Sequence, residues 1–490
     1  MRRDRAYVLY WMIAQRRTRW NFALQRAVEQ ARALDRPLIV VEALRCDYEW
    51  ASDRLHSFVL QGMADNVAAF RGKPLLYHPY VESSRGAGRG LLEALAARAI
   101  LVVTDDYPTF FLPRMINAAG ERLDVLLEAV DSNGLLPLRA ADRVFSSAYS
   151  FRSFLHRHLR SHLEHIPAPD PLDGVRLPKP PALPAAILDR WPSAAKWLPG
   201  DAGTLKKLPI DHTVAPGIAS GGQQAASRTL TEFLDRRLPR YNEQRSEPEA
   251  DASSGFSPYL HFGHLSVHEI FSALMTRERW TMRSLAASGK GKREGWWGVG
   301  ADAEAFLDEL ITWRELGYNM AWQRDDYQRF DSLPDWALGT LDAHRRDRRT
   351  HVYSADAFEQ AQTHDPLWNA AQMQIVREGR MHNYMRMLWG KKILEWTRRP
   401  EDAAAIMINL NNKYGVDGRD PNSYSGIFWC LGRYDRPWAP ERPIFGTIRY
   451  MSSDNTARKF SVKSYVRTYA PAGAQSDLYA DSPSSSQQDE

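Results

Sequence analysis

The sequence predicts an α/β domain followed by an all-α domain. Two observations carry this prediction. Over residues 1–135, short β-rich runs alternate with stretches of helical periodicity, an order typical of a doubly wound, Rossmann-like parallel sheet. From residue 223 the strand-like runs cease, and apolar residues recur with a period of roughly 3.6 residues. A chain of 490 residues also exceeds what one hydrophobic core usually supports.

Five predicted strands alternate with four predicted helices in the first part of the chain. The strands are 7–13, 37–43, 74–81, 99–106 and 124–132, and the helices between them are 19–34, 52–70, 91–99 and 110–123. The GxGxxG fingerprint of dinucleotide-binding domains is missing after the first strand. The strand ends can still form a ligand crevice, an expectation that comes from the fold class alone.

Residues 136–222 are predicted to connect the two domains. Their larger part, 166–222, is too rich in proline and glycine for long regular elements. Composition leaves two alternatives open, an ordered segment wrapped around the first domain or a flexible linker.

Residues 223–469 are predicted to form the helical domain. Ser354 and Asp365 are expected N-caps, and Pro366 and Pro400 suit the first turn of a helix. Residues 381–396, MHNYMRMLWGKKILEW, are interpreted as lying on one helix. The helical runs are 225–238, 264–280, 303–322, 331–349, 354–362, 366–396 and 400–414. Residues 470–490 are expected to be a disordered tail.

Composition excludes several classes of protein. The chain has no apolar run of membrane-spanning length and no cleavage site typical of a signal peptide. Its two cysteines, Cys46 and Cys430, exclude a disulfide framework or a cysteine-rich metal site and suit a reducing cytoplasm. A net charge of +5 and a pI near 9.0 permit nucleic-acid binding without establishing it.

Two polar segments are candidate binding sites. In SSGFSPYLHFGHLS, residues 253–266, hydroxyls and a glycine precede a helix expected to begin at Pro258, an arrangement that can bind phosphate. The alternative is an ordinary helix cap. The second segment, 409–429, is predicted to gather its polar side chains in one loop, although turn chemistry alone explains such residues. Those side chains are Asn411, Asn412, Asp417, Arg419, Asp420 and Asn422.

Three tryptophans have a suggestive spacing. Trp389 and Trp396 lie seven residues apart, so their rings share a helix face about 10 Å apart along the axis. Trp368 precedes Trp389 by 21 residues. A series of oxidisable rings at such spacing can carry electrons between a buried redox cofactor and solvent. Core packing is the alternative that spacing alone favours.

Seven motifs in order resemble one known family. From residue 7 to about residue 469 the chain resembles the class II cyclobutane pyrimidine dimer (CPD) photolyases of the photolyase/cryptochrome family. The motifs are RLPRY (237–241), SPYLHFG (257–263), FLDELITWRE (306–315), PLWNAAQ (366–372), GRMHNYMRMLWGKKILEW (379–396), DGRDPNSYSGIFW (417–429) and IFGTIRYM (444–451). DGRDPN and the later IRYM favour class II over the other classes.

The resemblance implies an α/β antenna domain and a helical domain that binds FAD. It implies light-driven repair of pyrimidine dimers in UV-damaged DNA, in which excited reduced FAD donates one electron to the dimer and recovers it after the ring splits. No metal is expected. A second, antenna chromophore can be a deazaflavin or a folate, or be missing. The expected protein is a monomer of bacterial type, located in the cytoplasm and acting at the nucleoid.

The resemblance also assigns cofactor residues. Arg386 and Asp417 are expected to form an ion pair beside the flavin ring, where a fixed cation stabilises the anionic reduced form. Asn411 is the candidate for the hydrogen bond to flavin N5, and Asn383 is expected to face the ring. Gly418 and Arg419 are expected to pack along the cofactor. The residues expected around the FAD phosphates are Tyr241, Ser253, Ser254, Gly255, Phe256 and Ser257.

The dimer is expected to leave the duplex and bind beside the flavin. Trp313 and Trp429 are expected to offer flat apolar walls, and Met387 an adaptable one. Glu309 is expected to hydrogen-bond a base, which works best if burial raises its pKa. The alternative for Glu309 is an ion pair with Arg314.

DNA phosphates are expected to meet distributed basic residues, and a loop is expected to fill the gap left in the duplex. The loop residues are Asp435, Arg436 and Trp438, and the further candidates are Arg442, Arg449, Arg458, Lys459 and Lys463. A solvated basic surface is the alternative for each.

The chain departs from class II sequences at several positions. Asn383 stands where that class usually has glycine, and Ser423 replaces the glycine of the usual DPNGY. GYNMAW at 317–322 replaces an ADNF-type sequence. Two other readings remain: a cryptochrome-like blue-light photoreceptor, and a nucleotide-activating α/β enzyme with a helical appendage, which predicts a phosphate loop that the sequence lacks.

Overall fold

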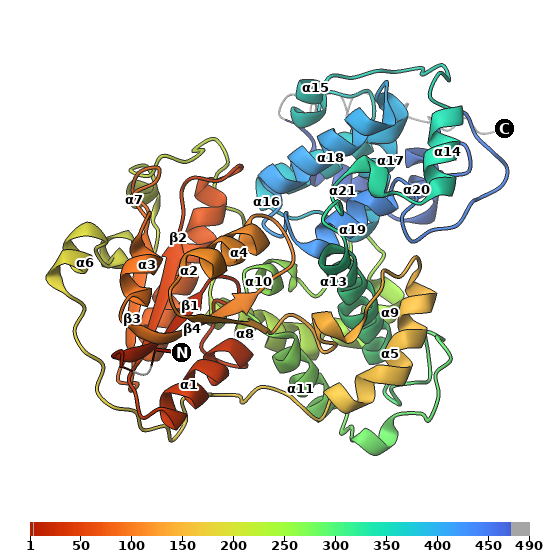
Figure 1. Cartoon of the computed structure of the whole chain (residues 1–490). Coiled ribbons are helices and arrows are strands. Elements are labelled where there is room, and N and C mark those ends of the chain that lie inside the picture. The colour runs from red at the N-terminus through yellow and green to blue at the C-terminus, as the bar shows by residue number, and fades with distance from the viewer. Residues whose placement is uncertain (3, 472–490) are drawn as a thin grey trace, which may run out of the picture.

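The computed structural model describes residues 1–2 and 4–471. Its first part is a five-stranded parallel sheet with helices on both faces, as predicted (Figure 1). The strand order, which the sequence did not predict, is β3-β2-β1-β4-β5. The strands are β1 Tyr7–Met12, β2 Leu38–Leu44, β3 Leu76–Val81, β4 Ala99–Asp106 and β5 Leu126–Asp131. The helices are α1 Phe22–Ala33, α2 Asp53–Phe70, α3 Leu91–Ala96 and α4 Leu112–Arg122.

Strand β1 is buried on both faces. Leu9 and Trp11 share a core with residues of α3 and α4, whereas Val8 and Tyr10 share a second core with residues of α1. Alternate residues of a strand point to opposite faces, so helices on both sides exclude water from the sheet.

The proline-rich segment 166–222 is an ordered wrap, one of the two alternatives that composition left open. Trp191 is buried in the same core as Trp11, and Trp197 packs with residues of α2 and β3. The segment contains only short helices, as its composition predicts: α6 Ala185–Arg190, η2 Ala194–Trp197 and α7 Ala202–Leu205.

The predicted connector also contains a long helix that was not predicted from the sequence. Helix α5, Ala148–His162, buries Phe151, Leu155 and Leu159 in one core with α8, α11 and α13. Part of the connector therefore packs as part of the helical region, while the boundaries at 135 and 222 stay predictions.

The rest of the described chain is helical, as predicted, and divides into two cores. One holds α8 Gln223–Glu232, α9 Tyr241–Gln244, α10 Ser257–His261, α11 Val267–Arg277, α12 Ala301–Leu307 and α13 Arg314–Gln323. The other holds α14 Asp335–Ala343, α15 Ala355–Glu359, α16 Pro366–Glu378, α17 Asn383–Trp396, α18 Pro400–Tyr414, α19 Pro421–Trp429 and α21 Lys463–Tyr469. Helix α20, Ser453–Lys459, precedes α21 and contributes no residue to this core. Short 3₁₀ segments are η1 Leu138–Ala140, η4 Leu238–Arg240, η5 Met282–Ser284 and η7 Phe330–Ser332, and π-helical segments are η3 Phe233–Arg237 and η6 Asp308–Trp313.

The long periodic run 366–396 is two helices. Gly379 ends α16 with a φ of 78°, a conformation that glycine adopts without strain, and α17 begins at Asn383. Two predicted caps are confirmed: the side chain of Asp365 accepts backbone N–H groups of Leu367 and Trp368, and that of Ser354 accepts one from Ala357.

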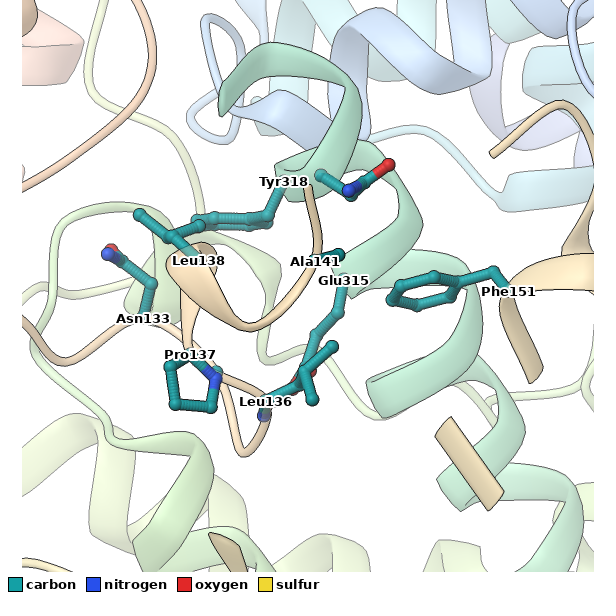
Figure 2. A pocket seen from close by; sticks show the side chains of 10 residues that line it. Asn133, Leu136, Pro137, Leu138, Ala141, Phe151, Glu315 and Tyr318 are labelled. Atoms are coloured by element: carbon teal, nitrogen blue, oxygen red, sulfur yellow. Dashed lines mark hydrogen bonds between the residues drawn. The ribbon is translucent and has the colours of Figure 1, made fainter. Parts of the chain in front are cut away.

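Helix α13 joins the two parts of the molecule. Glu315 accepts the backbone N–H groups of Leu135 and Leu136 at 2.7 and 3.0 Å, and Asn319 donates to the carbonyl of Arg143. A small cavity of about 10 Å³ lies beside these contacts, with Glu315 among the residues that line it from α13 (Figure 2). The helix thus fixes the segment between the sheet and α5.

Among the described helices, none combines the length and apolar character that crossing a membrane requires. The predicted disordered tail, 470–490, lies outside the described residues from position 472 onward.

Candidate functional site

The predicted site residues come together where α17, α18, α9 and η6 meet. Arg386 of α17 contacts Asp417, whose loop follows α18. One turn earlier, His382 donates from Nε2 to the backbone carbonyl of Arg245, and Arg245 pairs with Glu309 of η6. These contacts form one chain from the predicted cofactor residues to the predicted dimer residues.

The predicted ion pair between Arg386 and Asp417 is present but loose. Arg386 Nη2 lies 3.5 Å from Asp417 Oδ1, and both side chains are largely buried. Arg386 Nε is sealed from solvent without a hydrogen-bond partner. A buried guanidinium with an unused donor is costly, so its geometry favours a further acceptor at this place.

Asn411 and Asn412 do not lie in a loop, so the prediction of one polar loop over residues 409–429 is wrong for these two residues. Both belong to the last turns of α18, because the helical periodicity continues to Tyr414. Asp417 and Arg419 do lie in the loop, whereas Asp420 caps α19 through the backbone N–H of Asn422.

Gly418 and Arg419 shape that loop in different ways. A Cβ at Gly418 would lie 2.7 Å from the backbone oxygen of Asn411, so only glycine fits there. Arg419 turns its guanidinium back onto the carbonyls of Asn412 and Val416, and its own carbonyl accepts the hydroxyl of Thr109. Its side chain therefore stabilises the loop and its attachment to the sheet domain.

Residues 253–256 precede α10, and Ser257 is the first residue of that helix, one position before the predicted start at Pro258. Phe256 is fully buried against Phe233 and Phe306, and this packing anchors the segment. Ser253 accepts Arg237 Nη1 through its backbone carbonyl, and Arg237 Nε is sealed without a partner. Nearby, Tyr241 lies under the guanidinium of Arg245, 5.7 Å from Cζ to the ring centroid.

The partner of Glu309 is Arg245, so the alternative considered for Glu309, an ion pair with Arg314, is not formed. Arg314 donates instead to Asn133 and Tyr318 in the interior. Desolvation raises the pKa of Glu309 above its usual value, and the charge of Arg245 opposes this shift. Sequence reasoning missed Arg245, although its position four residues after Tyr241 of the RLPRY motif is a signal that places both on one turn.

Trp313 and Trp429 contact each other. Their ring centroids lie 5.2 Å apart with an interplanar angle of 29°, so the rings form one continuous aromatic surface and not two separate walls. Both rings are partly exposed, as is Met387 on α17. The π-helical turn η6 presents Glu309 and Trp313 on the same short segment, and such turns are frequent at functional sites.

Contacts link the three predicted tryptophans, and Trp368 takes the middle place. Its Nε1 donates to the carbonyl of Trp389 at 3.0 Å, and its ring centroid lies 6.0 Å from that of Trp396. All three are at most 2% exposed. The next ring outward is the partly exposed Tyr353, 5.7 Å from Trp396, which sequence reasoning missed because it lies in an irregular segment.

The predicted DNA loop is exposed and partly ordered by its own residues. Asp435 accepts the indole N–H of Trp438 at 3.0 Å and the backbone N–H of Arg436. The guanidinium groups of Arg436 and Arg449 lie over the Trp438 ring, 4.8 and 5.2 Å from its centroid. Trp438 remains 37% exposed, so its ring is open to a partner outside the protein.

The sheet domain contains a cavity of about 900 Å³ at the carboxyl ends of its strands. It lies where the strand order reverses between β1 and β4, the usual ligand position in such sheets. Arg419, His261 and Phe262 of the helical region close its inner side. The aromatic lining residues are Trp11, Tyr48, Tyr80, Tyr107, Phe110 and Phe111.

The residues of the helical site fit the expected FAD. Arg386 Nε, Arg237 Nε and His382 Nδ1 are buried without hydrogen-bond partners, and a polar ligand bound beside them would supply such partners. Among the described residues, no group of three or more His, Cys, Asp or Glu side chains is arranged to hold a metal ion.

Comparisons with known proteins give a consistent result. No family model matches the chain. Several curated proteins named deoxyribodipyrimidine photo-lyase match this chain over most of their own length. That of Methanothermobacter thermautotrophicus is 35% identical over 94% of each chain, and that of Oryza sativa subsp. japonica is 33% identical over 94% of this chain and 86% of its own. That of Potorous tridactylus is 32% identical over 95% and 81%.

Among solved structures, a class III photolyase from Agrobacterium tumefaciens superposes with a TM-score of 0.66 and 18% identity, covering 95% of this chain and 86% of that one. At this identity the likeness concerns the fold.

Proposed function

The chain belongs to the family of deoxyribodipyrimidine photo-lyases, and from this premise we propose how its residues repair UV-induced cyclobutane pyrimidine dimers with light. The observation that carries the proposal is the continuous set of contacts from Asp417 through Arg386, His382 and Arg245 to Glu309, which joins the predicted cofactor and dimer residues. Membership of the family makes the protein a carbon–carbon lyase that acts on damaged DNA.

The helical site is proposed to hold FAD, which supplies a light-excited one-electron donor when reduced and bound. Arg386 provides a fixed cation that favours an anionic ring, and Asp417 keeps that cation in place. Asn411 offers an amide at flavin N5, and Asn383 at the start of α17 faces the ring. The residues proposed to hold the phosphates and the adenosine side are Tyr241, Ser253, Ser254, Gly255, Phe256, Ser257 and Gly418. Arg419 acts indirectly, by fixing the loop.

The dimer is proposed to bind against the stacked surface of Trp313 and Trp429, beside Met387. Glu309 meets the polar edge of a base as a hydrogen-bond acceptor, because its carboxylate is paired with the guanidinium of Arg245. Arg245 orients that carboxyl. The loop of Asp435, Arg436 and Trp438 fills the gap in the duplex, and Arg449 contacts phosphate.

Trp389, Trp368 and Trp396 are proposed to deliver electrons that reduce the cofactor. The Trp368 indole reaches the backbone carbonyl of Trp389, and ring contacts then link Trp368 to Trp396. Trp396 in turn contacts the ring of the partly exposed Tyr353. Packing is a second role of the same rings, which fill the core of α16 and α17.

The cavity of the sheet domain is proposed to hold an antenna chromophore. Its volume and aromatic lining suit a planar conjugated ligand, either a deazaflavin or a folate. Reconstitution with each chromophore, followed by absorption and energy-transfer measurements, distinguishes the two. Trp11→Ala, in the cavity wall, should weaken binding of the true ligand.

We further propose assignment to class II, a monomeric state and a cytoplasmic location. DGRDPN at 417–422 and IRYM at 448–451 support the class. Sedimentation of the purified protein tests the monomer.

The central experiment illuminates the reduced protein with a dimer-containing oligonucleotide and follows the return of thymine absorbance. Repair should depend on light and on reduction. Bound flavin without repair would favour the cryptochrome-like photoreceptor, and a protein that binds no flavin would exclude both.

A further inference from the structure

Hydrogen bonds fix which end of the Asn411 side chain faces outward. Its Nδ2 donates to Ser423 Oγ at 2.9 Å and lies 3.4 Å from Oδ1 of Asn412. That atom of Asn412 is an oxygen, because it accepts the backbone N–H of Arg419 at 2.9 Å. The atom of Asn411 that faces it is therefore the amide nitrogen.

Both N–H groups of Asn411 are thus directed into the protein. Its Oδ1 has no hydrogen-bond partner among the described residues. Unlike the unpartnered atoms that are fully buried in this part of the chain, it keeps some accessible surface. Turning the amide over would bring two carbonyl oxygens, those of Asn411 and Asn412, to 3.4 Å from each other. The carbonyl oxygen is consequently the only group that Asn411 presents beside α18.

Ser423 completes this arrangement from α19. The hydroxyl gives the second N–H of Asn411 an acceptor in a place where Asn411 is only 1% exposed and Ser423 is 4% exposed. A glycine at position 423, usual in the sequences that the chain resembles, has no side chain to accept this bond. Without that acceptor, the Asn411 amide would be more stable with an N–H turned toward the ligand, since an unpaired buried donor costs free energy.

We propose that Ser423 is a positioning residue that directs the Asn411 carbonyl toward flavin N5 and so favours the reduced cofactor. The inference rests on the proposed function, in which Asn411 faces N5. Reduced flavin carries a hydrogen on N5 and can donate it to a carbonyl, whereas oxidised N5 offers only a lone pair. A fixed carbonyl therefore stabilises the reduced state and disfavours the oxidised one.

The test is the midpoint potential of the bound flavin, measured by spectroelectrochemical titration. Ser423→Ala should lower the ratio of reduced to oxidised flavin at a fixed potential by up to roughly tenfold, the size of one neutral hydrogen bond. For a two-electron couple this equals a shift of about 30 mV to more negative values. Ser423→Gly should shift the potential in the same direction.

Two comparisons separate positioning from a general structural effect. Ser425→Ala removes another buried hydroxyl of α19, one that donates to the carbonyl of Pro421, and should leave the potential unchanged. In an Asn411→Ala background, Ser423→Ala should have no further effect, because the amide that it positions is gone.

An unchanged potential in both Ser423 variants would overturn the inference, and so would an equal shift in the Asn411→Ala background. Neither result would affect the proposed function, which fails separately if the wild-type protein binds no flavin.

Discussion

The guanidinium of Arg245 lies against the carboxylate of Glu309, although the two residues are 64 positions apart in the chain. Arg245 follows α9 and also lies over the ring of Tyr241, while Glu309 belongs to the π-helical turn that carries Trp313. The pair therefore connects the proposed cofactor side of the site with the proposed dimer side.

Arg245→Gln should weaken binding of dimer-containing DNA by about tenfold, or about 1.4 kcal/mol. The cation opposes the desolvation that raises the pKa of Glu309, so its removal should raise that pKa further and free the carboxyl from its orientation. Fluorescence anisotropy with damaged and undamaged duplexes measures the effect.

Arg240→Gln is the matched control, because this exposed arginine on the preceding turn donates to the carbonyl of Asp251 and not to Glu309. Equal losses in both variants would show a general effect of charge and contradict the specific role of Arg245.

The fold could be predicted closely because its signals are local. Each strand lies within two residues of its predicted range, since β-rich runs and the helices between them differ sharply in period. Helix α5 was missed although Phe151, Leu155 and Leu159 recur at helical spacing. These three residues are interspersed with arginines and histidines, and this polar composition led the segment to be interpreted as a connector.

The residues of the site could be predicted only where they lie within one of the family motifs. Arg386 and Asp417 were paired in advance by resemblance, but nothing local in the sequence joins Arg245 to Glu309 or Tyr353 to Trp396. These pairs depend on how helices pack, and a helix periodicity specifies a buried face without specifying its partner.

Arg436→Ala should weaken binding to dimer-containing duplex and reduce its salt dependence by about one unit of slope, the value for one lost phosphate contact. Arg436 is exposed and lies over Trp438, so its removal should also loosen that ring. Arg71→Ala, an exposed cation of the sheet domain, should leave both quantities unchanged. Unchanged affinity in Arg436→Ala would contradict its assignment to DNA.

Stability should fall as the pH rises from about 4.5 toward 7 because of Glu315. Desolvation raises the pKa of this buried carboxyl from 4.5 to about 7, against the opposing charge of Arg314 and the N–H groups of Leu135 and Leu136. The folded state then binds more protons than the unfolded state in this range, so the free energy of unfolding decreases with pH, by up to roughly 3 kcal/mol. Urea unfolding at pH 5 and pH 8 measures it.

Glu315→Gln should remove this part of the pH dependence while lowering stability at every pH through one lost acceptor. Glu304→Gln, which also removes a carboxylate that accepts two backbone N–H groups, controls for that loss. A wild-type pH slope that persists in Glu315→Gln would assign it to another group.

Trp389→Phe should slow photoreduction of oxidised flavin yet leave repair by chemically reduced protein largely intact, since the tryptophan series serves only to supply electrons. Trp368 lies between Trp389 and Trp396, so Trp368→Phe should interrupt the same route, and Tyr353→Phe should lower its yield at the outer end. Transient absorption after a light pulse follows each step. Trp297→Phe is the matched control, because this ring is also buried and packs against Phe271 and Trp280 in the other core. If photoreduction is as fast in Trp389→Phe as in this control, the three rings are packing residues and electrons reach the flavin by another route.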